Sequence, residues 1–310
     1  MRRIRALRTS DSSARSEHGF VIVVVLWILM TLAALATTYA AYVGNSALSL
    51  AANDATIETD ALISAGIELT AYQLNAAPKD RRPTRGQFRT RIGNADLTVN
   101  YVSEAARIDL NAAPKPLLAG LFSVLGAAGA EADRYADRIV GWRTAPKQGA
   151  ADNESSLYRS AGLSYGPRGG PFAHTNELWL VQGLPPALVE RALPFVTVYS
   201  GLASVNIVDA PPEVIAALPD MTPDKLDGVL DRREMARPGQ TSANDILGSA
   251  QSSASTQGSN AFRVDVGARY DDGRWTAAEV VIFLSGDDDQ PYRVLAWGEL
   301  PERAGIGGMR

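Results

Sequence analysis

Residues 19–43 read GFVIVVVLWILMTLAALATTYAAYV, and from Phe20 onward this stretch holds no charged residue for 24 positions. At about 1.5 Å of rise per residue such a helix is roughly 36 Å long, and the hydrocarbon core of a bilayer is roughly 30 Å thick. The preceding residues contain five arginines against Asp11 and Glu17. Since an excess of basic residues stays in the cytoplasm, the stretch predicts one transmembrane helix, residues 20–43, with the remainder of the chain exported.

One small residue, Gly19, separates the polar leader from the apolar run. A secretory signal has its small-residue cleavage site after the apolar segment, whereas here the boundary glycine precedes it. Two other interpretations stay open, an uncleaved anchor and a secretory signal cleaved after Ala40. Sequencing of the mature N-terminus separates the three, because the chain would begin at Phe20, Met1 or Ala41.

The basic leader, the Gly19-Phe20 pair and the long apolar helix resemble the signal of type IV pilins and type II secretion pseudopilins. The resemblance implies that a prepilin peptidase cleaves between Gly19 and Phe20 and that Phe20 is then N-methylated. The fifth mature residue is normally a glutamate that neutralises a neighbour's N-terminal ammonium inside the membrane. In this chain the fifth mature residue is Val24, which cannot do so.

The overall charge disfavours polyanionic partners and the residue inventory disfavours catalysis. The chain has 30 Lys+Arg and 34 Asp+Glu; without the five basic and two acidic residues of the leader, 25 and 32 remain, a net charge of −7. An acidic protein binds nucleic acid poorly, so no nucleic-acid partner is expected. There is no cysteine, and beyond the leader His174 is the only imidazole. We therefore expect a protein that is not an enzyme.

The hydrophobic patterning predicts an α+β fold. Apolar residues at helical spacing over 44–77 extend the membrane helix as an amphipathic one that ends at Pro78. Alternation at 87–92 and 95–104 predicts a hairpin, and alternation over 262–270, 275–284 and 292–300 predicts three further strands that complete the same pilin-like antiparallel sheet. The expected parts are a leader (1–19), a transmembrane helix (20–43), an exported helix with the first strands (44–105), an inserted helical domain (106–250), a linker (251–260), the closing strands (261–300) and a tail (301–310).

The insertion contains a repeat. Residues 106–121, ARIDLNAAPKPLLAGL, are echoed 97 positions later by residues 203–218, ASVNIVDAPPEVIAAL. Each copy offers an Asn or Asp that can bond to nearby backbone, followed by proline in the first helical turn. The pattern resembles two helix-hairpin-helix units, although the second hairpin presents Asp220 instead of glycine. We expect a structural role, and the alternative is a membrane-anchored periplasmic DNA-binding protein.

Taken together, the leader, the doubled helical units and a Gly/Pro/Ser-rich segment at 144–172 resemble the K-class minor pseudopilins of type II secretion. That class lacks the fifth-position glutamate, in agreement with Val24. The resemblance implies a single-pass protein of the bacterial inner membrane, with a cytoplasmic N-terminus and a periplasmic bulk, that caps or initiates the periplasmic pseudopilus. The implied partners are the other minor pseudopilins, the major pseudopilin, the prepilin peptidase and the inner-membrane assembly platform.

The resemblance also raises the question of calcium. K-class relatives bind calcium through carboxylates in the segment after the first helical unit, and of that pattern this chain keeps Asp152 and Glu154. Ca²⁺ takes six to eight oxygen ligands, so two carboxylates are too few by themselves. Asp152 and Glu154 are the metal candidates, a solvated acidic loop is the other interpretation, and calcium is the only cofactor left open.

Overall fold

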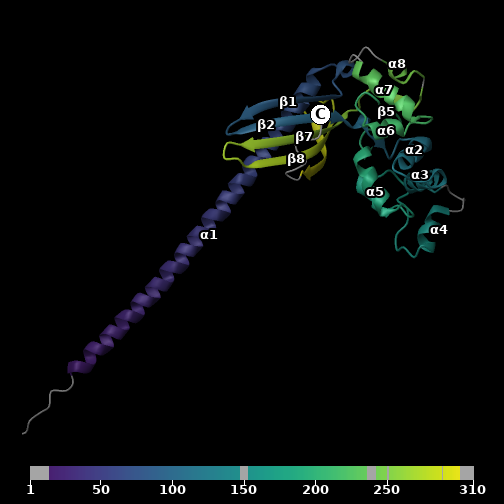
Figure 1. The fold of residues 1–310 in the computed structure, drawn as a ribbon. Helices are drawn as coiled ribbons and strands as arrows, with labels where there is room; N and C mark the ends of the chain where they lie inside the picture. Colours follow the sequence, from purple (N-terminus) through teal and green to yellow (C-terminus); the bar gives the residue numbers. More distant parts are fainter. Residues whose placement is uncertain (1–13, 147–152, 236–241, 250, 288, 301–310) are drawn as a thin grey trace, which may run out of the picture. The chain divides into compact units, whose positions relative to one another are not determined.

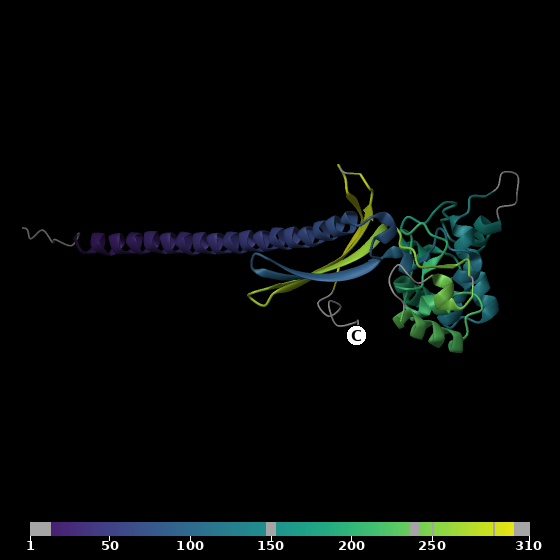
Figure 2. The same cartoon turned by 90° about the horizontal axis from the view of Figure 1, so that it is seen from above.

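The computed structural model describes residues 14–146, 153–235, 242–249, 251–287 and 289–300. The chain divides into two compact units, Met1–Asp60 and Ala61–Arg310, and the division falls within the long helix α1 (Ala14–Ala76). Figure 2 shows α1 as one uninterrupted helix. It ends just before Pro78, as the sequence predicts, because proline cannot donate the backbone hydrogen bond that would continue it.

The second unit contains a five-stranded antiparallel sheet in the order β1-β2-β7-β8-β9 (Figure 1). The predicted hairpin and the three predicted C-terminal strands therefore form one sheet, with β2 and β7 as the join between the two groups. Its register places Leu97 opposite Ala268 and Val99 opposite Val266. The strands are β1 (Arg85–Ile92), β2 (Ala95–Ser103), β7 (Ala261–Tyr270), β8 (Trp275–Leu284) and β9 (Tyr292–Glu299), preceded by the 3-10 turn η1 (Lys79–Arg81).

The last turns of α1 pack on one face of this sheet. Ile67 and Leu74 are buried against alternate residues of β2, β7 and β8, which is the half-buried alternation that the sequence shows. Gly66 marks the close approach, because a Cβ on Gly66 would lie 2.8 Å from Cγ1 of Val266. Helix and sheet thus form a first hydrophobic core.

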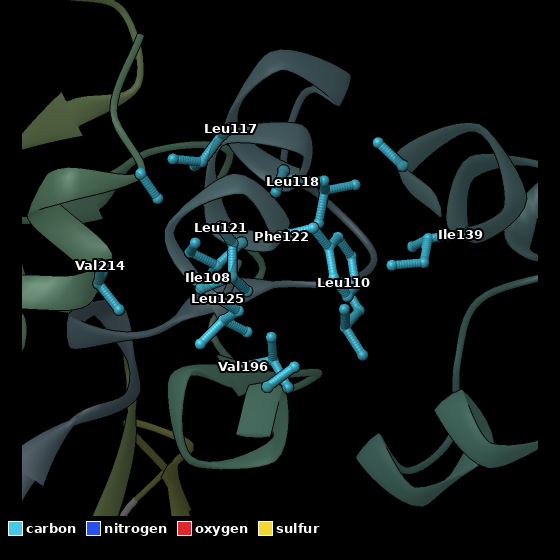
Figure 3. Close-up of a cluster of buried hydrophobic side chains, with 14 of the residues drawn as sticks. Ile108, Leu110, Leu117, Leu118, Leu121, Phe122, Leu125, Ile139, Val196 and Val214 are labelled. Atoms are coloured by element: carbon cyan, nitrogen blue, oxygen red, sulfur yellow. The ribbon is translucent and has the colours of Figure 1, made fainter. Parts of the chain in front are cut away.

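The helical insertion between β2 and β7 has a second core of its own. Figure 3 shows Leu117, Leu121 and Phe122 of one helix packed with Ile139 and Val214 of two others. Its first half comprises η2 (Glu104–Ala106), β3 (Ile108–Asp109), α2 (Lys115–Val124), α3 (Gly129–Arg143), α4 (Asn153–Ser160), η3 (Thr175–Leu180), α5 (Pro186–Ala192), η4 (Leu193–Phe195) and β4 (Val196–Thr197). The second half comprises β5 (Val205–Asn206), α6 (Pro212–Ala216), α7 (Pro223–Met235), α8 (Ala243–Leu247) and β6 (Ala254–Ser255).

The segment 251–260, predicted as a flexible linker, has a different structure. Its strand β6 pairs in parallel with β5, and the side chains of Ser253 and Ser259 are buried. The backbone N–H of Ser259 donates to Oγ of Ser103 over 2.8 Å. A serine-rich composition predicts a solvated chain, but here the backbone carbonyls of Ser253 and Ser255 accept hydrogen bonds, and the Ser259 hydroxyl accepts or donates them, within folded parts of the chain, so the helical insertion extends through β6.

Candidate functional site

The membrane helix predicted from the sequence lies within α1. One helix in the described part of the chain is long and apolar enough to cross a bilayer, Phe20–Ser46, with a mean hydropathy of 2.7 and none of its most apolar window buried. Gly19, Phe20 and Val24 all lie in α1, and the Phe20 side chain is 71 % exposed. The cleavage and methylation at these residues stay predictions.

The internal repeat is visible as two helical units with the same hydrogen bonds. Residue 109 and its counterpart 97 positions on, Asn206, each close the turn before a helix. Asp109 Oδ1 accepts from the backbone N–H of Asn111 over 2.7 Å, and Asn206 Oδ1 accepts from that of Val208 over 2.9 Å. The predicted Asn/Asp role is confirmed for both copies.

Each unit is also closed at its far end in the same way. Arg143, at the end of α3, donates to the carbonyl oxygens of Leu110 and Ala113, the latter over 2.7 Å. Arg233 in α7 donates to the carbonyl oxygen of Ala210 over 2.7 Å, and Ala210 is the repeat counterpart of Ala113. A parallel strand pair completes each unit, β3 with β4 and β5 with β6.

The turns between the paired helices each contain a residue with a left-handed backbone. Gly126 has φ 94° between α2 and α3, and Asp220 has φ 57° between α6 and α7. Asp220 is the only described non-glycine residue with positive φ, a conformation that Asn and Asp tolerate better than other side chains. The second turn therefore presents a carboxylate where a phosphate-binding hairpin would present bare N–H groups.

The Gly/Pro/Ser-rich segment 144–172 contains the helix α4. Tyr158 of α4 is fully buried beside Trp142, with ring centroids 6.0 Å apart, and its hydroxyl accepts from the backbone N–H of Gln182 over 3.0 Å. Burial raises the pKa of Tyr158 to about 12, which keeps the hydroxyl protonated. Tyr158 and Trp142, which are distant in the sequence, thus pack α4 against α3.

Glu177 is the main polar anchor of this region, and the sequence analysis did not identify it as one. Its carboxylate accepts from Nε1 of Trp142 over 3.0 Å, from Nη1 of Arg168 over 2.8 Å and from the backbone N–H of Ala173 over 2.9 Å. The cap at the start of η3 is His174, whose Nδ1 accepts from the N–H of Asn176 over 3.1 Å.

The two calcium candidates can be followed only in part. Asp152 lies outside the described residues. Glu154, at the start of α4, forms an ion pair with Arg138 of α3, with Oε2 and Nη1 2.9 Å apart. Within the described ranges no group of three or more acidic, histidine or cysteine side chains is arranged to hold a metal ion. The described neighbour of Glu154 is thus the Arg138 guanidinium, and calcium binding through Asp152 and Glu154 stays a prediction.

A buried ionic network joins the sheet to the helical insertion. The Glu104 side chain is fully buried at the end of β2, where it accepts from Nε of Arg263 over 2.8 Å and from Nη1 of Arg107 over 3.3 Å. It also accepts from the hydroxyl of Thr197 in β4. One carboxylate therefore bonds to the neighbouring sheet strand and to the last strand of the first helical unit. Nothing in the sequence pattern predicts the bonds to Thr197 and Arg263, since these two partners are 93 and 159 positions away.

Asp265 extends this network on β7, directly across from Glu279 of β8. Burial, followed by the charge of Glu279, raises the pKa of Asp265 to about 6. Its Oδ1 atom is buried without a hydrogen-bond partner. The charged form of this carboxyl is therefore unfavourable in the folded sheet.

One family model matches part of the chain. Residues 95–201 match the family model described as type II secretion system (T2SS), protein K. The matched range runs from β2 through the first helical unit and β4. No curated protein matches the chain.

The chain is also similar in fold to a solved structure, the GspK-GspI-GspJ complex from the type 2 secretion system of enterotoxigenic Escherichia coli. The match has a TM-score of 0.58 and 17% sequence identity, and it covers 80% of this chain and 96% of the chain it matches. At this identity the likeness concerns the fold: a long helix on an antiparallel sheet that carries a helical insertion.

Proposed function

Because the chain is a member of the type II secretion system protein K family, we propose that this minor pseudopilin forms the tip of the periplasmic pseudopilus. The match over 95–201 carries the proposal, because it covers the part of the insertion that ordinary pilin-like sheets lack. The role is structural and not enzymatic: the subunit acts by its position in a filament.

The proposed topology follows from the N-terminal segment. The apolar part of α1, Phe20–Ser46, anchors the subunit in the bacterial inner membrane as a single span. The arginines of the leader hold the N-terminus in the cytoplasm, and the sheet and insertion lie in the periplasm. Prepilin peptidase cleaves between Gly19 and Phe20, and Phe20 becomes the methylated N-terminus.

The tip position is supported by two features of the chain. Val24 leaves the subunit without the carboxylate that would receive the ammonium of a subunit above it. The helical insertion, with its own core, adds a second body to the sheet between β2 and β7. Both features suit a first subunit, which needs neighbours on only one side.

The proposed partners follow from this position. The solved structure of similar fold is a complex with GspI and GspJ, and we propose that two such minor pseudopilins bind this subunit. The major pseudopilin, the prepilin peptidase and the inner-membrane assembly platform are the remaining partners in the same scheme.

Mass spectrometry of the mature N-terminus tests the proposal. The expected result is a chain that begins at methylated Phe20. A variant of the full chain with a substitution at Gly19 should remain unprocessed. An intact Met1, or a chain beginning at Ala41, would contradict the filament role, because either form lacks the free pilin-type N-terminus.

A further inference from the structure

Two buried carboxylates connect the helical insertion to the five-stranded sheet. Glu104 lies where β2 leads into the first helical unit, and Asp209 lies in the second unit, between β5 and α6. The Glu104 side chain is fully buried and that of Asp209 is 1% exposed. The repeat counterpart of Asp209, 97 positions earlier, is Ala112, so this carboxylate belongs to the second unit alone.

The contact at Glu104 is the stronger of the two. Glu104 accepts from Nε of Arg263 over 2.8 Å and from Nη1 of Arg107 over 3.3 Å, and both arginine side chains are mostly buried. The hydroxyl of Thr197 also donates to this carboxylate. Hydrogen bonds between charged and buried groups are the strong ones, and several of them end on this one side chain.

The contact at Asp209 is weaker. Its Oδ1 lies 3.6 Å from Nε of Arg85 at the start of β1, and the Arg85 side chain is 68% exposed. Among the described residues no hydrogen bond reaches this Oδ1, and Oδ2 accepts from Nδ2 of Asn206 within the same unit. Burial raises the pKa of Asp209, although the nearby cations Arg85 and Arg233 act in the opposite direction. The pairing with β1 therefore does not offset the cost of burying this charge.

The two helical units themselves share one hydrophobic core. Figure 3 shows Leu117 and Leu121 of α2 packed with Val214 of α6, and all three belong to the same buried cluster. Separating the units would expose this apolar core to water, which is costly. Breaking the contact between Asp209 and Arg85 exposes two charged side chains, which water solvates well. If a part of this structure opens, the contact at Asp209 opens first.

We propose that the helical insertion turns as one body on the sheet about the junction at Glu104, and that the contact between Asp209 and Arg85 is the latch that keeps it closed. Helix α7 lies next to the latch, because Arg233 of α7 donates to the carbonyl oxygen of Ala210. When the latch opens, α7 and β1 move apart while the two helical units stay packed together. The inference holds whether or not the subunit forms the filament tip.

Distances between spin labels on the full chain in detergent micelles test this inference, and the chain has no cysteine of its own to interfere. One pair of labels, at Gln87→Cys in β1 and Asp227→Cys in α7, spans the latch at two exposed positions. Arg85→Gln removes the cation of the latch. We expect the population at longer distance to grow roughly two- to fivefold, the range for an ion pair with one exposed partner.

A matched variant separates the latch from a general loss of positive charge. Arg89 is exposed on the same strand, across from Thr98, and forms no ion pair with a described residue. Arg89→Gln should therefore leave the distances unchanged. A second pair of labels, at Asp227→Cys and at Glu190→Cys in α5, lies within the insertion and should give the same distance in every variant.

Three results would overturn the inference. One is a distance distribution in Arg85→Gln that equals that of the unaltered arginine. Another is an equal change in Arg89→Gln, because charge alone would then control the distance. The third is a changed distance between positions 190 and 227, since the insertion would then not turn as one body.

Discussion

Gly120 of α2 lies directly against the carbonyl oxygen of Ala217 at the end of α6, and a Cβ on Gly120 would come within 2.0 Å of that oxygen. The two residues are 97 positions apart, the same offset as the internal repeat. The two helical units therefore meet at equivalent positions, and the contact requires a residue without a side chain on one side.

Gly120→Ala should destabilise the helical insertion. The obstructing atom is a backbone oxygen held by helix α6, so the new methyl group must push the two units apart, at a cost of about 1–3 kcal/mol. Urea unfolding of the variant should show a lower midpoint. Gly129→Ala is the control, because nothing lies within 4 Å of its added Cβ; equal midpoints for the two variants would refute the close contact.

The sheet and the repeat could be predicted because their determinants are local. Alternating residues in β7 and β8 bury one face, and that pattern is visible in a single strand. The side chains of Asp109 and Asn206 each accept from a backbone N–H two residues further on, so their roles can be predicted from the adjacent sequence. Sequence offset alone also identified Ala113 and Ala210 as counterparts.

The remainder of the site depends on long-range contacts that composition does not show. Ser259 belongs to a polar segment typical of linkers, but its backbone bonds to Ser103, 156 positions away. No sequence motif indicates that Glu177 bonds to Trp142. Glu154 was selected as a metal candidate because it is acidic, and its ion pair with Arg138 of another helix could not be predicted. Such pairings become visible only once the chain is folded.

Glu104→Gln should destabilise the junction between sheet and insertion. The variant keeps the shape of the side chain but leaves the buried guanidinium groups of Arg263 and Arg107 without this counter-charge, and breaking a buried pair costs about 3–5 kcal/mol. Chemical denaturation should measure the loss. The comparison is Asp271→Asn, which removes an exposed partner of Arg91 and should leave the midpoint unchanged; a similarly mild effect at Glu104 would show that the network is not stabilising.

Asp265 should make the stability of the unit that contains the five-stranded sheet depend on pH. Its folded pKa of about 6 is above the ordinary 3.8, so folding is favoured when the carboxyl is protonated. The stabilisation is fully present below about pH 4 and is lost as the pH rises through about 6; two pKa units correspond to about 3 kcal/mol. Asp265→Asn lacks this titration, so the wild type should lose stability relative to the variant between about pH 4 and pH 7.

The measurement is the urea midpoint of both proteins across that pH range. Glu190→Gln, at an exposed position of α5, should follow the wild type and controls for loss of a negative charge. Parallel curves for Asp265→Asn and the wild type would contradict this prediction, because they would mean that burial does not raise the pKa of Asp265.

Val24→Glu should impair the proposed tip subunit without preventing its processing. The substitution places a carboxyl group in the apolar segment Phe20–Ser46, at a cost of roughly 3 kcal/mol unless an ammonium pairs with it. At the tip no subunit lies above to provide that ammonium, so we expect fewer pseudopili and reduced secretion, while mass spectrometry still finds Phe20 as the first residue. Val24→Leu, which stays apolar, should secrete normally. Wild-type filament numbers and secretion in the glutamate variant would place the subunit inside the filament, where a neighbour's N-terminus neutralises the new charge.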